Sequence, residues 1–182
     1  MRHHNDQHRR LSYQPNIGVY LTSPTAIKPT RATADSACWD VSACLVDGTR
    51  VQTLDQFNEQ HNRLIEDGKL CIFAGERALV PTGCIFDIPQ GWSLRLHPRS
   101  GLAWKRGVSL ANCEGVIDSD YVNETYVAVF NHSGLPFVVN HGDRIAQVEL
   151  VPVQIPEFTQ LQAPPMNKTQ RNGGFGSTGV ES

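Results

Sequence analysis

Short apolar segments separated by turn-forming residues constrain the fold of this 182-residue chain more than any other feature. Four such segments stand out, at residues 92–97, 125–130, 137–139 and 145–153. The first alternates apolar and polar side chains with a period of two, and the second is β-branched and aromatic. Clusters of Asn, His, Gly, Ser and Asp at residues 131–134 and 140–143 separate the later segments. Short strands at this spacing predict an all-β sandwich or jelly roll.

One segment departs from the strand pattern. Residues 53–67 contain neither Gly nor Pro, Thr53 is a suitable N-cap, and Gly68 can end a helix. The residues that fall near one helical face are Leu54, Phe57, Leu64 and Ile65. We therefore expect one inserted short helix whose apolar face packs on the body of the protein. The alternative is that this face docks a partner protein.

The composition excludes several classes of protein. With 40% hydrophobic and 19% charged residues, the chain fits a soluble globular protein with one core. A formal net charge of −2 argues against nucleic acid as a partner, since such binders usually carry a broad basic face. No apolar run is long enough to cross a membrane, and residues 1–10 lack the apolar stretch of a secretory signal. Five cysteines without a CxxC pair indicate reduced, mostly buried thiols in a cytoplasmic protein.

The end of the chain is rich in glycine. In order, we expect a flexible polar arm, one β domain, and a linker with a flexible flap, at residues 1–15, 16–159 and 160–182. Within the flap, glycines allow the backbone to approach a ligand, and consecutive N–H groups can hold phosphate oxygens. Arg171 adds a positive charge, Phe175 a flat stacking surface, and Ser177 and Thr178 hydroxyl donors. This pattern predicts a flap that closes over a nucleotide; the alternative is a solvated chain end.

Two internal segments carry candidate binding residues. Pro98 and Gly101 bracket Arg99 and Ser100, which indicates a turn that presents both to a ligand. The planar guanidinium group suits phosphate, although a surface turn with a salt-bridged Arg fits equally. Residues 112–121 begin with Asn and continue with two apolar residues, two carboxylates and a tyrosine. A carboxylate beside an apolar pocket can deprotonate water, and Asn can read the edge of a base, but a turn rich in Asx residues is the alternative.

Two further polar residues lie in segments of strand type. Asp40 is expected either to pair with a basic group or to lie near a hard cation such as Mg²⁺. Asp143 and Arg144 begin a strand that contains Gln147, and an ordinary hairpin with a surface ion pair is the alternative there. No nucleophilic triad and no Walker-type loop is present in the sequence, so the expected chemistry uses water.

Taken in order, five segments resemble the five signature motifs of the homotrimeric dUTP diphosphatase (dUTPase) family. They are residues 36–43, 98–103, 115–121, 142–147 and 173–179, and residues 75–83 also match the family's framework. The resemblance implies a jelly-roll-like β-barrel and a homotrimer whose active sites are shared between subunits. It further implies hydrolysis of dUTP to dUMP and pyrophosphate, which limits uracil in DNA and supplies dUMP for dTMP synthesis.

The resemblance also implies a role for each candidate residue. Asp118 would deprotonate the water that attacks the α-phosphorus, and Asp40 would reach Mg²⁺ through a water molecule. The nucleoside would contact Asn112, Gly115, Val116, Ile117 and Tyr121. The phosphates would contact Arg99, Ser100, Gly101 and Gln147. From the flap, the nucleotide would contact Arg171, Phe175, Gly176, Ser177 and Thr178, with the phenyl ring stacked on uracil.

The sequence departs from the family pattern at three places. Cys38 stands where Gly is usual, and Gln170 stands where the flap has its Arg, with Arg171 one residue later. Residues 46–69 form an insert through which a protein partner could bind. One alternative function is therefore a dUTP-binding regulatory protein that uses this insert. Another is a dCTP deaminase-type relative, with Glu124 as its carboxylate. A phage-encoded member would act in the host cytoplasm.

Overall fold

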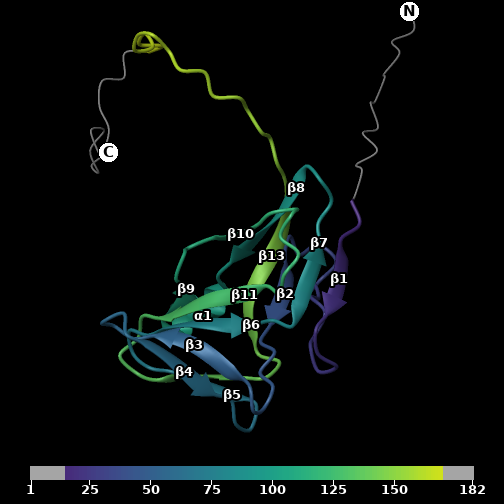
Figure 1. Ribbon diagram of the computed structural model, residues 1–182, viewed down its shortest axis with the longest axis vertical. Helices are drawn as coiled ribbons and strands as arrows, with labels where there is room; N and C mark the ends of the chain where they lie inside the picture. The colour runs from purple at the N-terminus through teal and green to yellow at the C-terminus, as the bar shows by residue number, and fades with distance from the viewer. Residues whose placement is uncertain (1–14, 170–182) are drawn as a thin grey trace, which may run out of the picture.

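The computed structural model describes residues 15–169, which form thirteen strands and one short helix on the outside of the body (Figure 1). The strands before the helix are β1 (Gly18–Leu21), β2 (Trp39–Ser42), β3 (Arg50–Leu54), β4 (Gln60–Leu64), β5 (Lys69–Ile72), β6 (Arg77–Pro81), β7 (Cys84–Asp87) and β8 (Trp92–His97). After α1 (Ser100–Arg106) follow β9 (Val108–Leu110), β10 (Gly115–Ile117), β11 (Tyr126–Asn131), β12 (Phe137–Asn140) and β13 (Arg144–Pro152). No helix in the described range is long and apolar enough to span a bilayer.

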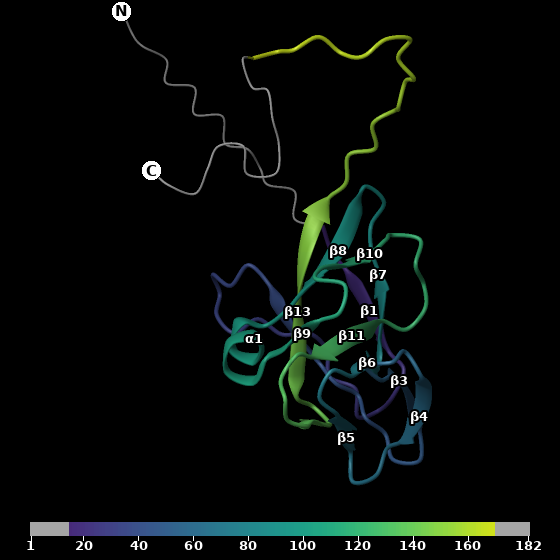
Figure 2. The same cartoon turned by 90° about the vertical axis from the view of Figure 1, so that its left-hand side faces the viewer.

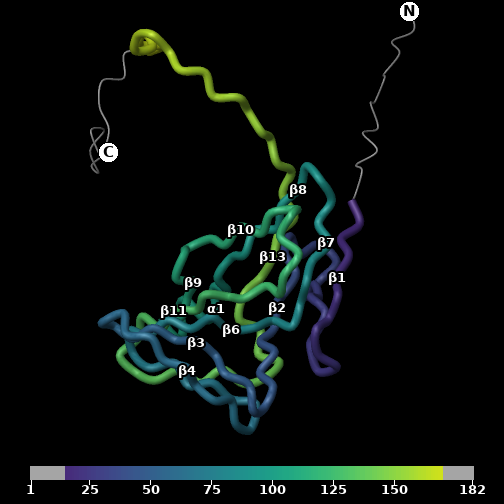
Figure 3. The backbone as a smooth tube through the Cα atoms, in the orientation of Figure 1, coloured from purple at the N-terminus to yellow at the C-terminus, as the bar shows by residue number. Residues whose placement is uncertain are grey.

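Two antiparallel sheets enclose the core. One has the strand order β10-β8-β13-β2 and the other the order β4-β3-β6-β11-β9, and the pairs β1-β7 and β12-β5 complete the structure. Strands far apart in the sequence therefore lie side by side, as the continuous backbone path shows (Figure 3). This arrangement confirms the expected all-β, jelly-roll-like fold.

Period-two patterning decides which side chains form the core. In β8, Leu94 and Leu96 are buried, whereas Arg95 between them lies on the opposite face and is partly exposed. In β11, Val127 and Val129 are fully buried in the same way. Since each of these side chains contributes roughly 1.5–3 kcal/mol when buried, the alternation fixes the register of both sheets.

The helix predicted at residues 53–67 is wrong, because this segment forms the hairpin β3–β4. The Oδ1 atom of Asp55 accepts hydrogen bonds from the backbone N–H groups of Phe57 (2.8 Å) and Glu59 (2.9 Å), which turns the chain. Asn58 takes a left-handed φ of 65° at the tip. Thr53 then pairs with β6 instead of capping a helix. Strand pairing and the Asx turn together outweigh the helical apolar pattern.

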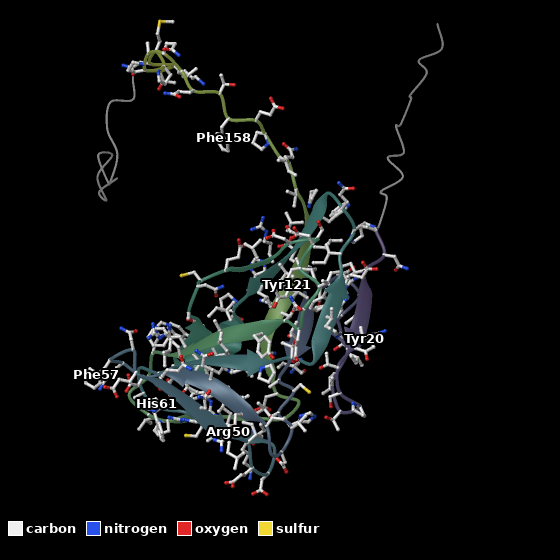
Figure 4. All side chains as sticks on the ribbon, in the orientation of Figure 1. Tyr20, Arg50, Phe57, His61, Tyr121 and Phe158 are labelled. Carbon is white, nitrogen blue, oxygen red and sulfur yellow. The ribbon has the colours of Figure 1, made fainter. Side chains whose placement is uncertain are left out.

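A buried ion pair fastens the hairpin to the body. The guanidinium of Arg63 in β4 lies 2.7 Å from a carboxylate oxygen of Glu76, which is 1% exposed, and it also donates to the carbonyl of Cys71. The same guanidinium stacks over the ring of Phe73, 4.2 Å from its centroid. At the other end of the hairpin, Phe57 is 75% exposed and points away from the body (Figure 4).

Beyond the body, residues 153–169 leave β13 as an extended segment (Figures 1 and 2). Its side chains have little contact with the rest of the chain, and Phe158 is 98% exposed. The five cysteines are free thiols: Cys44 and Cys84 are buried, two are partly exposed, and Cys113 is exposed. Burial of the thiols is thus less complete than the sequence suggested.

Candidate active site

Two arginines hold one aspartate at the end of the four-stranded sheet. Asp40 in β2 accepts from Arg99 Nε through Oδ1 (3.0 Å) and from Arg144 Nη1 through Oδ2 (2.8 Å). Nη1 of Arg99 also donates to the backbone carbonyl of Arg144 at 3.0 Å. The Asp40 side chain is 13% exposed, so both ion pairs lie in a partly desolvated place where they are stronger than at an open surface. Asp40, Arg99 and Arg144 thus form a closed ring of contacts that carries one net positive charge.

Local structure explains how these side chains meet. Strand β8 ends at His97, and the carbonyl of the next residue, Pro98, accepts a hydrogen bond from Nε2 of Gln147 at 3.0 Å. Arg99 follows in an extended conformation as the N-cap of α1, and its carbonyl accepts from Leu102 N and Ala103 N. Gln147 in β13 lies opposite both His97 of β8 and Asp40 of β2. The register of three strands therefore brings residues 40, 99 and 147 to one sheet end.

A cavity of about 310 Å³ opens beside this ring. Its polar lining residues are Ser36, Cys38, Asp40, Arg99, Ser100, Arg144 and Gln147, with Gly101 at the start of α1. Two guanidinium groups against one carboxylate favour an anionic ligand, and phosphate matches the planar donors. Burial, followed by the carboxylates of Glu149 and Asp40, raises the pKa of the Cys38 thiol. The thiol therefore stays protonated near neutral pH, which argues against a cysteine nucleophile here.

The second group of candidate residues lies in the turn from β9 to β10 and beyond. Gly115 is buried, and a Cβ atom there would lie 3.0 Å from Leu96 Cβ and 3.4 Å from Asn112 Nδ2. The exposed Asn112 thus places its amide directly against the Gly115 backbone. The turn includes Cys113 at a left-handed φ of 59°. A side chain at position 115 would press on Leu96, so packing against β8 favours glycine there.

Beyond Gly115 come two apolar residues and then a carboxylate. Val116 is 49% exposed and Ile117 is buried, after which Asp118 is exposed. Asp118 accepts the backbone N–H of Tyr121 through its own carbonyl at 3.1 Å, which closes a turn. The Tyr121 hydroxyl donates to the carbonyl of Glu124 at 2.9 Å, and the ring remains 40% exposed (Figure 4). The Asp118 carboxylate is therefore free to meet solvent or a ligand.

The fold keeps Asp118 apart from the phosphate residues within one chain. Ile117 pairs with Leu94 near the start of β8, whereas Arg99 lies beyond the other end of that strand. Five residue steps separate the two levels, on the order of 15 Å at ~3.3 Å per residue. Gly115 is nearer to that end, because it pairs with Leu96, but β10 lies on the other side of β8 from β13 and β2. The structure thus brings Asp40, Arg99, Ser100, Gly101 and Gln147 together and leaves the residues from Asn112 to Tyr121 on the β10 side of the sheet. The predicted flap residues Arg171, Phe175, Gly176, Ser177 and Thr178 lie outside the described residues.

Sequence reasoning missed the role of Arg144. It suggested an ion pair between Asp143 and Arg144, but the Asp143 carboxylate instead accepts from the backbone and side-chain amides of Asn140, at 2.8 and 3.0 Å. Arg144 reaches across the sheet to Asp40. Only the pairing of β13 with β2 brings these residues together, and the sequence contains no local signal of that pairing.

Comparisons with known proteins agree with this architecture. Residues 64–179 match the family model described as dUTPase, a range that contains Arg99, Asp118 and Gln147 but not Asp40. A deoxyuridine 5'-triphosphate nucleotidohydrolase of Rhizobium rhizogenes is 46% identical over 120 residues, covering 64% of this chain and 74% of the relative. Another with that name, from Rhizobium etli, is 46% identical over 115 residues, 63% of this chain and 72% of the relative.

Solved structures share the fold over most of the chain. A mutant dUTPase of Staphylococcus bacteriophage 80alpha has a TM-score of 0.71 at 21% identity, covering 92% of this chain and 100% of the other. The dUTPase of Streptococcus mutans has a TM-score of 0.60 at 26% identity, covering 78% of this chain and 99% of the other. The family model matches more than half of the chain, residues 64–179, and a relative is 46% identical. The chain therefore belongs to the dUTPase family.

Proposed function

We propose that this protein hydrolyses dUTP to dUMP and pyrophosphate. The observation that carries the proposal is the cavity beside the Arg99–Asp40–Arg144 ring, because it offers phosphate donors in a chain of the dUTPase family. Arg99, Ser100, Gly101 and Gln147 would hold the phosphates. Donors fixed before the substrate arrives stabilise charge that develops in the transition state without further reorganisation.

The base and sugar would be held by the turn around Gly115. The amide of Asn112 and the backbone of Gly115, Val116 and Ile117 would pair with the uracil edge, while Tyr121 would pack under the deoxyribose. A base with the wrong donors would leave these polar groups unpaired, which is costly in a desolvated site. The contact between Asn112 and Gly115 supports this arrangement, since it fixes the amide against the backbone.

Asp118 would act as the general base. Its side chain is exposed, follows a buried residue, and has no assigned partner within the described residues that would compete for a water. It would orient and deprotonate the water that attacks the α-phosphorus, and a base in this role typically contributes about 10²–10⁴-fold. The flap residues Arg171, Phe175, Gly176, Ser177 and Thr178 would close over the nucleotide and exclude bulk water.

The residues present fit a magnesium ion. A staphylococcal phage dUTPase is described with a structural Mg(II) ion. In this chain the Asp40 carboxylate lies at the edge of the phosphate cavity, and Mg²⁺ in such sites usually keeps several waters besides one or two carboxylates and substrate phosphates. Asp40 would hold the ion through water. When bound, the ion would neutralise charge on the triphosphate.

The separation of the two residue groups supports a shared active site. One chain places Asp118 far from Arg99, so a second copy would have to supply the missing half. Strand β11 supports such an assembly, because it is apolar on both faces: Val127 and Val129 face the core, and Tyr126 on the other face is 48% exposed. An aromatic residue exposed on the outer face of a strand is typical of a surface that another chain covers. We propose the homotrimer that the family resemblance implies.

Glu124 favours the diphosphatase over the deaminase. Its Oε1 atom accepts the backbone N–H of Gly83 at 2.8 Å, so the carboxylate is used to join two loops. A catalytic glutamate would need to face the substrate. This contact therefore supports a structural role for Glu124.

The insert supports a second, regulatory function. Staphylococcal phage dUTPases are described as controlling the transfer of virulence genes. In this chain the exposed Phe57 at the hairpin tip offers an apolar contact to a protein partner. Comparing proteins captured from the host lysate by the full chain and by a Phe57→Ser variant tests this: capture by the full chain alone supports the docking role, and equal capture removes it.

Pyrophosphate release with Mg²⁺ tests the main proposal. We would offer dUTP, dCTP, dTTP and UTP separately, and we expect rapid release from dUTP alone. Slower release from UTP would show that the site selects the deoxyribose, and slower release from dCTP would show that it selects the base. No release from dUTP, with the nucleotide still bound, would refute hydrolysis and favour the regulatory function.

A further inference from the structure

Both carboxylate oxygens of Asp40 are already occupied by guanidinium groups. Oδ1 lies 3.0 Å from Arg99 Nε and Oδ2 lies 2.8 Å from Arg144 Nη1. The proposed function requires the same carboxylate to hold a magnesium ion through water. Each oxygen can accept a second hydrogen bond, but the two guanidinium groups already neutralise the carboxylate charge that attracts a cation, so release of one ion pair would strengthen the hold of Asp40 on the hydrated ion.

The two arginines are held unequally. Arg99 is 27% exposed, uses Nη1 on the carbonyl of Arg144, and is fixed by its place at the start of α1. Arg144 is 53% exposed, and within residues 15–169 its guanidinium makes one hydrogen bond, the one to Asp40. It also borders the register shift between Arg144 and Ala146 in the pairing of β13 with β2. Arg144 is therefore the partner that can leave at smaller cost.

We infer that Arg144 is a positioning residue that holds Asp40 in the free enzyme and exchanges this contact for the substrate's phosphates when Asp40 turns to the metal. The inference rests on the proposed function and adds a residue to it. Arg144 lines the same cavity as Arg99, Ser100 and Gln147, so its side chain can move from the carboxylate to an anion without leaving the site. No new charge has to be buried, because the guanidinium remains paired in both states.

The exchange has two consequences of opposite sign. Without the Arg144 side chain, Asp40 loses a competitor and the cavity becomes less positive, so a divalent cation should bind more tightly. The same loss removes a phosphate donor, so the nucleotide should bind more weakly. A purely structural role would change both affinities in the same direction or change neither.

The test uses the full chain with the non-hydrolysable analogue α,β-imido-dUTP. Binding of Mn²⁺ to the protein–analogue complex is followed by electron paramagnetic resonance, and analogue affinity is measured by calorimetry at saturating Mg²⁺. In Arg144→Gln we expect Mn²⁺ to bind about fivefold more tightly, because the ion no longer competes with a partly exposed ion pair of ordinary strength. We expect the analogue to bind about tenfold more weakly, as for one lost charge-assisted hydrogen bond. Arg144→Lys should fall between the two.

Arg95→Gln is the matched control. Arg95 lies on β8 of the same sheet and has a comparable exposed ion pair with Glu114, 3.5 Å away and outside the cavity. It should leave both affinities unchanged. Weaker Mn²⁺ binding in Arg144→Gln, or no change, would overturn the exchange, whereas pyrophosphate release from dUTP by the wild-type chain would still uphold the proposed function. Failure of the wild-type chain to bind the analogue would overturn both.

Discussion

The two edges of the four-stranded sheet, β2 at the phosphate end and β10 at the base end, hold the two halves of the proposed site in different ways. At the phosphate end, charged side chains from β2, β13 and the start of α1 hold one another, with Asp40 between two guanidinium groups. At the base end, the backbone around Gly115 would form the site, and side chains contribute few contacts. Phosphate would thus be met by preorganised charge, whereas the base would be read by a backbone edge. Each end would be incomplete without the other.

Replacing the proposed base should have the largest effect. Asp118→Asn keeps the size and polarity of the side chain but removes its ability to accept a proton. Turnover of dUTP should fall by about 10²–10⁴-fold, while affinity for α,β-imido-dUTP stays close to that of the wild type. Single-turnover kinetics and calorimetry measure the two quantities. Full turnover in this variant would remove Asp118 from the role of base.

Mixing two inactive variants tests whether the two ends of the sheet serve different copies of the chain. Asp118→Asn and Arg99→Ala should each be almost inactive alone. Co-expressed in equal amounts, they should recover about a quarter of wild-type activity if every site takes these residues from different subunits. Turnover by the purified mixed assemblies measures the recovery.

The double variant Asp118→Asn/Arg99→Ala, co-expressed with wild-type chain, is the control for this mixing. Sites shared between subunits should again leave about a quarter of the activity, whereas sites within one chain would leave about half. No recovery with the single variants, together with half activity in the control, would contradict the shared site.

Sequence patterns predicted the strands of the two sheets, and the family resemblance supplied the residues proposed for both halves of the site, but neither indicated which charged side chains pair. Period-two alternation is local, so the segments that became β8 and β11 could be identified from their own residues. The hairpin β3–β4 could not, because Leu54 and Phe57 suit a helix face equally well and strand pairing with β6 decided the outcome. The Asp40–Arg144 pair depends on the register of distant strands, which no local pattern reports.

A methyl group at position 115 should disturb the base end and spare the phosphate end. In Gly115→Ala the new Cβ atom would lie 3.0 Å from Leu96 Cβ, so the turn has to shift, at a cost of roughly 1–3 kcal/mol. The KM for dUTP should rise about tenfold, through the displaced Asn112 amide, with a smaller change in kcat. Gly134→Ala is the control, since nothing lies within 4 Å of its added Cβ atom. A loss of kcat alone would place Gly115 outside base recognition.

One cysteine near each end of the sheet, Cys38 before β2 and Cys113 before β10, allows the smallest difference to be measured. Cys38 lines the phosphate cavity, where burial and the carboxylates of Glu149 and Asp40 raise the pKa of its thiol, whereas Cys113 is exposed in the turn before Gly115. Since the thiolate is the reacting form, iodoacetamide at pH 7 should modify Cys113 first, about tenfold faster, and Cys38 should gain reactivity as the pH rises through its raised pKa. Peptide mass spectrometry follows both sites, and Cys113→Ser should remove the fast phase alone. Equal rates at pH 7 would show that the phosphate end is as open to solvent as the base end.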